Sequence, residues 1–378
     1  MSATDLPPAV ARLLEREPPA GGWLDPEYDP GLVSVIITTY NSETLIGETL
    51  GSILAQTYDK LEVIVADDGS TDGTREVLER WRERFRVERG WEFKVLSQPN
   101  HGQNSARNLG ARASRGEYLN FFDSDDLMSA GRLTTMVEAL RSGGLDVVHG
   151  PWVRFYPDRG GHYVTGQTFF DLGPDLLHSW LTAGSLIIWS CLLTRRFASS
   201  VGPFDDRLVG GNVGSEHILR LVLQQPRMAC CQAPPIFYRR HRASVTFNLK
   251  PQAYANAIYW LTLLERNLEG SGRLAGYRGE LAGRYRRYAT GAYRDGADDL
   301  GLYCATRAAE HDPDFAPSRK LLRKVAHRLG GQRLALKVQG RTERLRRWRW
   351  RLASAVGLTP RLEPVTWVAE LPLQESQK

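Results

Sequence analysis

Four short apolar segments alternate with helical segments in the first third of the chain, and this order limits the folds open to it. A helix between successive strands is typical of a parallel sheet with helices on both faces. The carboxyl ends of such strands lie at one edge of the sheet, where ligands bind. We therefore expect an α/β fold with its functional residues at that edge. The predicted strands are Leu32–Asn41, which runs into a turn, Leu61–Ala66, Phe93–Leu96 and Tyr118–Phe122.

The fourth strand runs directly into three carboxylates, Asp123, Asp125 and Asp126. Carboxylates so close together repel one another unless a cation joins them, and a divalent ion shared with a substrate's phosphates is a common solution. Taken alone, the pattern is weak, and an acidic turn that caps the next helix explains it better. Its place beside two other polar strand ends favours the metal site.

Those two strand ends are Thr38-Thr39-Tyr40 and Asp67-Asp68. An aromatic ring can stack on a nucleobase, and a carboxylate can accept a hydrogen bond from an imide N–H. Of the two aspartates, Asp68 is the preferred acceptor, because Asp67 is as well explained by holding its loop. Together with the acidic turn, these residues predict a site for a nucleotide and a metal ion.

Four segments with this order and spacing resemble the family 2 glycosyltransferases of GT-A fold: Val33–Asn41, Gln56–Thr74, Asn100–Asn108 and Gly116–Asp126. The resemblance extends over roughly residues 32–245. It implies a Rossmann-like, mostly parallel sheet and a nucleotide-sugar donor, usually a UDP-sugar. It also implies Mn²⁺ or Mg²⁺ and transfer with inversion to a hydroxyl of a sugar, lipid-linked or small-molecule acceptor, as in bacterial cell-surface glycan synthesis.

The resemblance assigns roles to individual positions. Asp125 would bind the metal together with Asp123, and His241 would supply a nitrogen to the metal or a cation to the leaving phosphate. His241 is a lone histidine in a basic loop, so the alternative that it has neither of these roles is equally open. The implied donor-binding residues are Thr38, Thr39, Tyr40, Glu43, Asp68, Arg107, Asp123 and Ser124.

The general base is where this sequence departs from the family pattern. Family members carry a Glu-Asp pair before a Leu-Arg-Leu-like segment, but counting back from residues 219–221 places Val213 and Gly214 there. Glu216 lies in the first turn of the same helix, where the helix dipole favours an ionised carboxylate. We therefore expect Glu216 to be the base, with His217 in reserve. The alternative is that Glu216 only caps its helix.

Two other functions are compatible with parts of the pattern. A non-catalytic nucleotide-sugar-binding protein would explain the irregular base segment. A nucleotidyltransferase shares the carboxylates at strand ends, but it would need a Gly-rich, cationic loop after the first strand, and residues 38–41 contain none. The glycosyltransferase is therefore the preferred hypothesis.

Composition divides the chain into four expected regions. They are a flexible, Pro-rich leader without a signal peptide (1–30), a GT-A domain (31–250), a helical extension (251–317) and a basic tail (318–378). Residues 150–184 read as an irregular, aromatic-rich segment that contacts the acceptor or fills a small second core. In the extension we expect helices over 254–268 and 281–302.

The tail concentrates the positive charge of the chain. Thirteen Lys or Arg residues against one acid, Glu343, give residues 319–351 a charge of +12, so the remaining residues carry −6. A basic amphipathic tail suits an anionic membrane surface or the acidic body of the enzyme itself. No nucleic-acid module is evident. With no membrane span and no Cys-x-x-Cys pair, we expect a cytoplasmic protein, with peripheral contact at the inner face of the membrane as an option.

Overall fold

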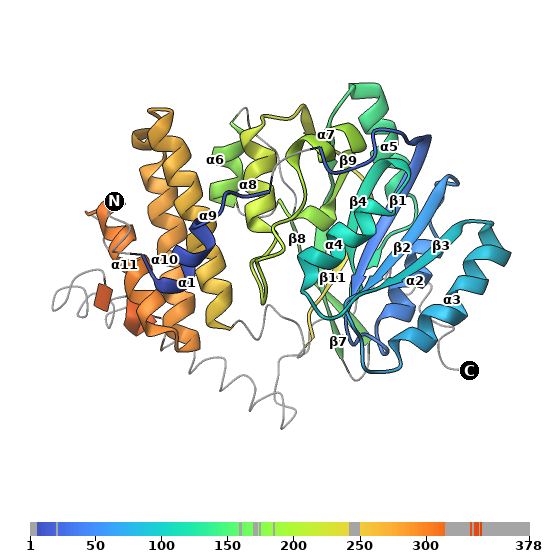
Figure 1. Cartoon of the computed structure of the whole chain (residues 1–378), viewed down its shortest axis with the longest axis horizontal. Coiled ribbons are helices and arrows are strands. Elements are labelled where there is room, and N and C mark those ends of the chain that lie inside the picture. Colours follow the sequence, from blue (N-terminus) through green and yellow to red (C-terminus); the bar gives the residue numbers. More distant parts are fainter. Residues whose placement is uncertain are drawn as a thin grey trace.

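A seven-stranded, mostly parallel sheet forms one side of the molecule, at the right of Figure 1, and the helices α9 to α11 lie at the left. The computed structural model describes residues 6–19, 22–158, 161–168, 173, 175–183, 186–241, 250–313, 333–334, 336–339 and 341. The strands lie in the order β10-β6-β9-β4-β1-β2-β3, and β9 is antiparallel to both of its neighbours. They are β1 (Asp29–Thr39), β2 (Leu61–Asp67), β3 (Glu92–Ser97), β4 (Gly116–Asp123), β6 (Val147–His149), β9 (Cys191–Thr194) and β10 (Met228–Cys230). The predicted α/β fold is confirmed.

The register of the central strands aligns their polar ends. Thr38 on β1 pairs with Asp123 on β4, and Thr39 pairs with Asp67 on β2. Because β1 is parallel to both neighbours, all three strands end at the same edge of the sheet. This register gathers the polar strand ends that the sequence places far apart.

Helices cover both faces of the sheet, and each face has its own apolar core. Ile36 of β1 belongs to one core cluster, whereas its neighbours Val35 and Ile37 belong to the other, as expected for alternating strand residues. Helices α4 (Gln103–Arg112), α7 (Arg195–Val201) and α8 (Ser215–Leu223) contribute to the Ile36 face. Helices α2 (Ile46–Leu54), α3 (Thr74–Arg89) and α5 (Arg132–Gly143) contribute to the other.

A second, four-stranded sheet lies beside the acidic turn, with the order β5-β11-β7-β8. Its strands are β5 (Leu127–Met128), β7 (Trp152–Asp158), β8 (Gly161–Thr168) and β11 (Ile236–Arg239). Strand β5 begins directly after the acidic turn and pairs antiparallel with β11. The second sheet therefore holds the far end of that turn.

The helical extension continues the core of the main sheet. It consists of α9 (Pro251–Gly270), the short helix η4 (Leu274–Tyr277), α10 (Arg278–Asp295) and α11 (Asp298–His311). The core cluster that contains Ile36 runs through α8 into α9 and reaches Cys304 on α11. Two further segments precede α8, namely α6 (Leu176–Ala183) and η2 (Ile188–Ser190).

Three sequence-based predictions differ from the structure. Residues 8–14 of the expected flexible leader form α1, whose Val10 is buried against the core that includes α9. The helix expected over 281–302 is two helices, because Gly296 adopts a left-handed φ of 86° that ends α10. The expected irregular segment contains β7, β8 and α6, and its Trp152, Phe155 and Trp180 are buried.

Most of the predicted basic tail lies outside the described residues. In the part of the tail that is described, Leu336 is buried, and Lys337 and Arg341 each lie 3.4 Å from the carboxylate of Asp298 on α11. These contacts agree with docking on the acidic body for this short stretch. Within the residues that the structure describes, no helix has the length and apolar character needed to cross a membrane.

Candidate active site

The end of β1 contributes two buried hydroxyls and one exposed ring to the edge of the sheet. Thr38 and Thr39 are buried, and neither side-chain oxygen has a hydrogen-bond partner among the described residues. Tyr40 is 48% exposed, which leaves its ring accessible for stacking. Unsatisfied hydroxyls beside an accessible aromatic ring suit a polar, planar ligand.

Asp68 holds the loop that follows β3. Its Oδ1 accepts hydrogen bonds from Gln98 Nε2 (2.7 Å) and the His101 amide (2.9 Å), and its Oδ2 accepts from the Gly102 amide (2.9 Å). A carboxylate oxygen can accept two hydrogen bonds, so Oδ2 retains capacity for an imide N–H. The predicted base-binding role of Asp68 is therefore compatible with its structural one.

Glu43 serves the neighbouring loop. Its Oε2 accepts a 2.6 Å hydrogen bond from the Gly73 amide, and its own amide donates to Asp72. Ser124 is buried. Its Oγ lies 3.1 Å from Ser42 Oγ, and its carbonyl oxygen accepts a hydrogen bond from Thr49 Oγ1. Both predicted donor-binding residues thus support loops at this edge.

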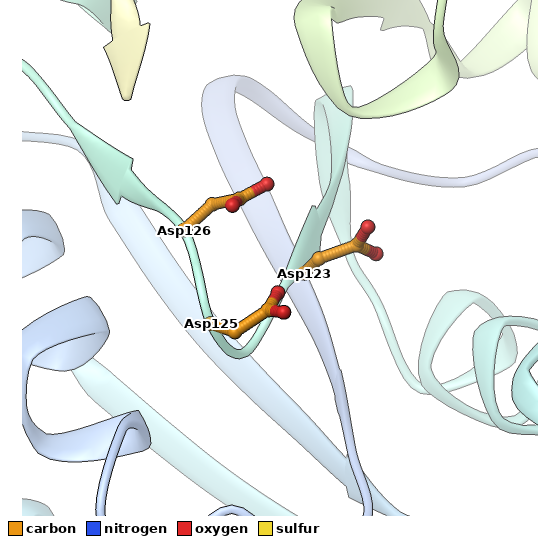
Figure 2. A group of neighbouring side chains, drawn as sticks. All are labelled: Asp123, Asp125 and Asp126. Atoms are coloured by element: carbon orange, nitrogen blue, oxygen red, sulfur yellow. The ribbon is translucent and has the colours of Figure 1, made fainter. Parts of the chain in front are cut away.

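The three carboxylates converge at the end of β4. Asp123 closes the strand, while Asp125 and Asp126 project to the same side from the turn that follows (Figure 2). One oxygen atom from each lies within 4.8 Å of the others. Asp126 is fully buried, and its Oδ2 has no partner among the described residues. Burial and the neighbouring carboxylates raise the pKa of Asp126 well above its usual range.

This oxygen-rich cluster fits a divalent cation. Carboxylates are the preferred ligands of Mg²⁺ and Mn²⁺, and a buried oxygen without a partner gains one when an ion binds. His241 Nε2 lies 2.9 Å from Asp125 Oδ2, so the histidine is close enough to add a nitrogen ligand. The residues present therefore fit the metal that the sequence predicts.

Helix α4 holds Asp123 from one side. Asp123 Oδ1 accepts from Gln103 Nε2 (2.9 Å) and from Arg107 Nη2 (3.2 Å). Burial raises the pKa of Asp123, an effect that Arg107 opposes. Arg107 is itself buried, and its Nη1 donates to Asn104 Oδ1. A guanidinium fixed beside the acidic cluster can contact a bound phosphate.

Arg239 on β11 holds the acidic turn from the other side. Its amide donates to Asp126 Oδ1 (2.8 Å) and its Nε to the Asp125 carbonyl (2.7 Å). Its Nη2 donates to Glu48 Oε2 (2.5 Å), and the side chain is buried over the ring of Phe155. One arginine thus ties together the turn, helix α2 and the second sheet.

Glu216 and His217 lie in the interior, away from solvent. Glu216 is 0% exposed, and its hydrogen bonds are with Arg220, at 2.5 and 3.0 Å. Burial raises the pKa of Glu216, although Arg220 opposes this. The ring of His217 stacks on Phe204 at 3.9 Å, and burial, with Arg220 and Arg107 nearby, lowers its pKa well below the usual range.

The comparisons with known proteins agree with this geometry. The model described as "Glycosyl transferase family 2" matches residues 34–201, which contain the second half of β1, strands β2 through β9 and the acidic cluster. This region belongs to glycosyl transferase family 2. Glycosyltransferase GlyG of Streptococcus pneumoniae serotype 4 is 33% identical over 141 residues, which are 36% of this chain and 45% of that protein. The match therefore spans less than half of this relative.

Two solved structures share the fold. S. aureus TarS 1–349 in complex with UDP-GlcNAc has a TM-score of 0.51 and 17% identity, over 76% of this chain and 93% of that one. Mannosyltransferase PcManGT from Pyrobaculum calidifontis, in complex with GDP-Man and Mn²⁺, has a TM-score of 0.51 and 20% identity, over 89% and 92%. At these identities the likeness shows the GT-A fold.

The family match ends at residue 201, so Glu216, His217 and His241 all lie beyond it. The structure brings His241 to the acidic cluster but pairs Glu216 with Arg220, which argues against Glu216 as the base. The pairing was visible in the sequence, since Glu and Arg four residues apart share one helix face.

Three contributors to the site received no individual role from the sequence. Asp126 follows the predicted ligands directly, and its position in the same acidic run was the available signal. Gln103 lies in the segment that carries the family resemblance, where it draws no attention by residue type. Arg239 has no local signal, because it reaches the acidic turn only through the pairing of β5 with β11.

Proposed function

We propose that the chain is a metal-dependent, inverting glycosyltransferase that moves a sugar from a nucleotide sugar to an acceptor hydroxyl. The observation that carries this proposal is the cluster of three carboxylates, one of them fully buried, at the carboxyl edge of a family 2 sheet. The unpartnered Oδ2 of Asp126 supports a cation there. Asp123, Asp125 and Asp126, with His241, would hold it.

The donor side of the site follows from the neighbouring strand ends. Tyr40 would stack on the base, and Asp68 Oδ2 would accept the imide N–H of uracil, which favours a UDP-sugar. TarS was solved with UDP-GlcNAc and PcManGT with GDP-Man, so both nucleotides belong in a test. Arg107 would contact the diphosphate or the sugar beside Asp123.

In the proposed reaction, the acceptor oxygen forms a bond to the anomeric carbon from the face opposite the diphosphate. The bond from that carbon to the phosphate oxygen breaks, and its electron pair leaves with the nucleoside diphosphate. The acceptor's proton passes to a base. A bound divalent ion supplies charge stabilisation of the leaving diphosphate, and Arg107 adds a fixed positive charge.

A second candidate function is favoured by one observation. Glu216 is buried in an ion pair, so the acid expected to accept the proton does not reach the site in this arrangement. A non-catalytic protein that binds nucleotide sugars would need no such acid. The same cluster and the same stacking ring would then serve recognition alone.

One experiment separates these functions. The full chain is incubated with UDP- and GDP-sugars and Mn²⁺, and release of the nucleoside diphosphate is measured beside calorimetric binding. Release that EDTA abolishes supports the glycosyltransferase. Tight binding of a nucleotide sugar without release, with or without a panel of sugar and lipid-linked acceptors, favours the binding protein. Release that is indifferent to EDTA contradicts the metal assignment.

The acceptor and the place of action are also proposals. A sugar or lipid-linked acceptor in cell-surface glycan synthesis agrees with the family, and the predicted tail would bring the enzyme to an anionic membrane. Sedimentation with anionic liposomes tests the membrane contact. Equal pelleting of the full chain and of a chain ending at residue 313 would contradict it.

A further inference from the structure

The loop between α7 and α8 adopts an unusual backbone near the acidic cluster. Gly210, Gly211 and Asn212 have consecutive φ values of 77°, 110° and 52°. The two glycines accept such angles readily, and asparagine adopts a left-handed φ more often than most residues, but three such angles in a row are uncommon and gain support from the surroundings. We name residues 209–213 the rim loop. Its conformation is specified by contacts outside the loop.

Helix α9 of the helical extension provides that support through Asn256. Both donor contacts of its Nδ2 are to the rim loop, to the carbonyls of Val209 (2.9 Å) and Gly211 (2.8 Å). Its Oδ1 accepts from Gln252, which fixes the orientation of the carboxamide. Asn256 is 0% exposed. Asn212 completes the connection by donating to the Ala253 carbonyl at 2.9 Å.

The other side of the rim loop touches the residues that hold the acidic cluster. Asn104 Nδ2 donates to the Val213 carbonyl at 3.0 Å, while its Oδ1 accepts from Arg107, which in turn donates to Asp123. At the opposite end of the loop, a Cβ placed on Gly102 would lie 2.9 Å from Val209 Cγ1. The loop therefore lies against the first turn of α4.

From these contacts we infer that α9 positions the rim loop as one wall of the sugar-binding part of the site, and that Asn256 is the positioning residue. This inference rests on the proposed function. The sugar of a nucleotide sugar is attached to the phosphate farther from the base, which the metal and Arg107 would hold. The space beside Arg107 is therefore bounded by the rim loop, whereas the base lies at Tyr40 and Asp68.

Two variants test the inference from opposite ends of the connection. Asn256→Asp replaces the donating amide by a carboxylate that faces two carbonyl oxygens, so it releases the loop by repulsion. Asn212→Gly removes the bond to Ala253 while keeping a residue that tolerates the left-handed angle. The control is Asn267→Asp, which makes the same change at an exposed position of the same helix.

Three measurements are made on each full-length variant. Calorimetry with Mn²⁺ compares the affinity for UDP with the affinity for a UDP-sugar, and the assay of nucleotide release gives kcat and KM. Thermolysin cleavage before Val213, read by mass spectrometry, reports opening of the rim loop without any substrate.

The inference predicts a selective loss. UDP affinity stays within about twofold, because the base-side contacts are untouched, while kcat/KM for the nucleotide sugar falls at least about tenfold. In both loop variants the UDP-sugar binds no more tightly than UDP. Thermolysin cleavage before Val213 becomes at least about tenfold faster. Asn267→Asp behaves as the wild type in all three measurements.

Two results would overturn the inference while leaving the proposed function intact. One is that Asn256→Asp and Asn212→Gly turn over the nucleotide sugar with the same kcat/KM as an active wild type. The other is a parallel loss of UDP affinity in both variants, because a general loss of structure would then explain the effect. A wild type that binds and turns over no nucleotide sugar overturns the proposed function itself.

Discussion

Replacing Glu216 by glutamine separates a structural role of this residue from a catalytic one. Its two oxygens accept from Arg220 at 2.5 and 3.0 Å, and the side chain is 0% exposed. Glutamine keeps one acceptor oxygen but turns a donating amide toward Arg220. We expect this loss of one charge-assisted hydrogen bond to lower the free energy of unfolding by about 1.5–3 kcal/mol.

The cost stays moderate because Arg220 keeps other partners. Its guanidinium also donates to three backbone carbonyls, those of Pro19, Val201 and Pro203. The larger penalty for stranding a buried charge, about 3–5 kcal/mol, is therefore not expected. Domains are commonly stable by about 5–15 kcal/mol, so Glu216→Gln should remain folded at 25 °C.

The assay measures stability and turnover on the same preparation. Urea unfolding gives the midpoint and slope, and nucleotide release gives kcat for the folded protein. A structural Glu216 predicts a lower urea midpoint with kcat within a few-fold of the wild type. The control is Glu83→Gln, an exposed glutamate on α3 that also pairs with an arginine, Arg86, and both measurements should be unchanged.

One outcome would refute this reasoning. If Glu216→Gln unfolds at the wild-type urea midpoint while kcat falls by about 10²–10⁴, the usual contribution of a general base, then Glu216 is the base after all. The ion pair with Arg220 would then have to open when substrate binds, and the same loss should appear without any change in UDP affinity.

Three further predictions concern the metal, the base and acid stability. Asp125→Asn should weaken Mn²⁺ binding, measured by electron paramagnetic resonance, at least about tenfold, since a carboxylate is lost from the cluster. Tyr40→Ala should weaken UDP binding by about 1–3 kcal/mol in calorimetry, whereas the exposed Tyr28→Ala should not. Burial, with Arg132 nearby, lowers the pKa of His149 to about 4. This pKa returns to about 6.5 on unfolding, so the unfolded state binds a proton that the folded state does not. The free energy of unfolding therefore falls by about 3 kcal/mol as the pH falls from 6.5 to 4. His149→Gln should remove this pH dependence.

Each of these has a contrary result. Mn²⁺ affinity that is unchanged in Asp125→Asn would place the ion elsewhere. Equal UDP affinity in Tyr40→Ala and the wild type would remove the stacking role. If His149→Gln and the wild type lose stability in parallel between pH 6.5 and 4, other groups cause the acid sensitivity.

The sequence was sufficient for β1 to β4 of the seven-stranded sheet, because the information that specifies these strands is local. Each of β1 to β4 is a short apolar run between helical segments, and parallel pairing follows from that alternation. The convergence of Thr38, Asp68 and Asp123 needs only the rule that parallel strands end together. These predictions depend on neighbours in sequence, so no tertiary contact was required to make them.

The leader prediction that differs from the structure depends on a contact between distant residues, and the surroundings of Glu216 depend on both near and distant ones. Helix α1 is a short, proline-led segment that is buried because α9, some 240 residues later, packs on it. The sequence places Glu216 in the first turn of a helix near the site. The direction of its side chain depends on Arg220, which also donates to the Val201 carbonyl. The segment of α1 has no composition signal for its burial, whereas the spacing of Glu216 and Arg220 was a local signal of their ion pair.

The acidic turn itself shows why a match to the family region does not fully specify the site. Asp123 is held by α4, within the matched residues, but Asp125 and Asp126 are held by Arg239 on β11, outside them. Three carboxylates whose oxygens lie within 4.8 Å of one another oppose each other's ionisation, so the turn is not stabilised by its own side chains. Its geometry must therefore be imposed by both sheets. It follows that residues of β11, the strand of the second sheet that lies outside the family match, should influence metal affinity as strongly as the carboxylates' immediate neighbours in sequence.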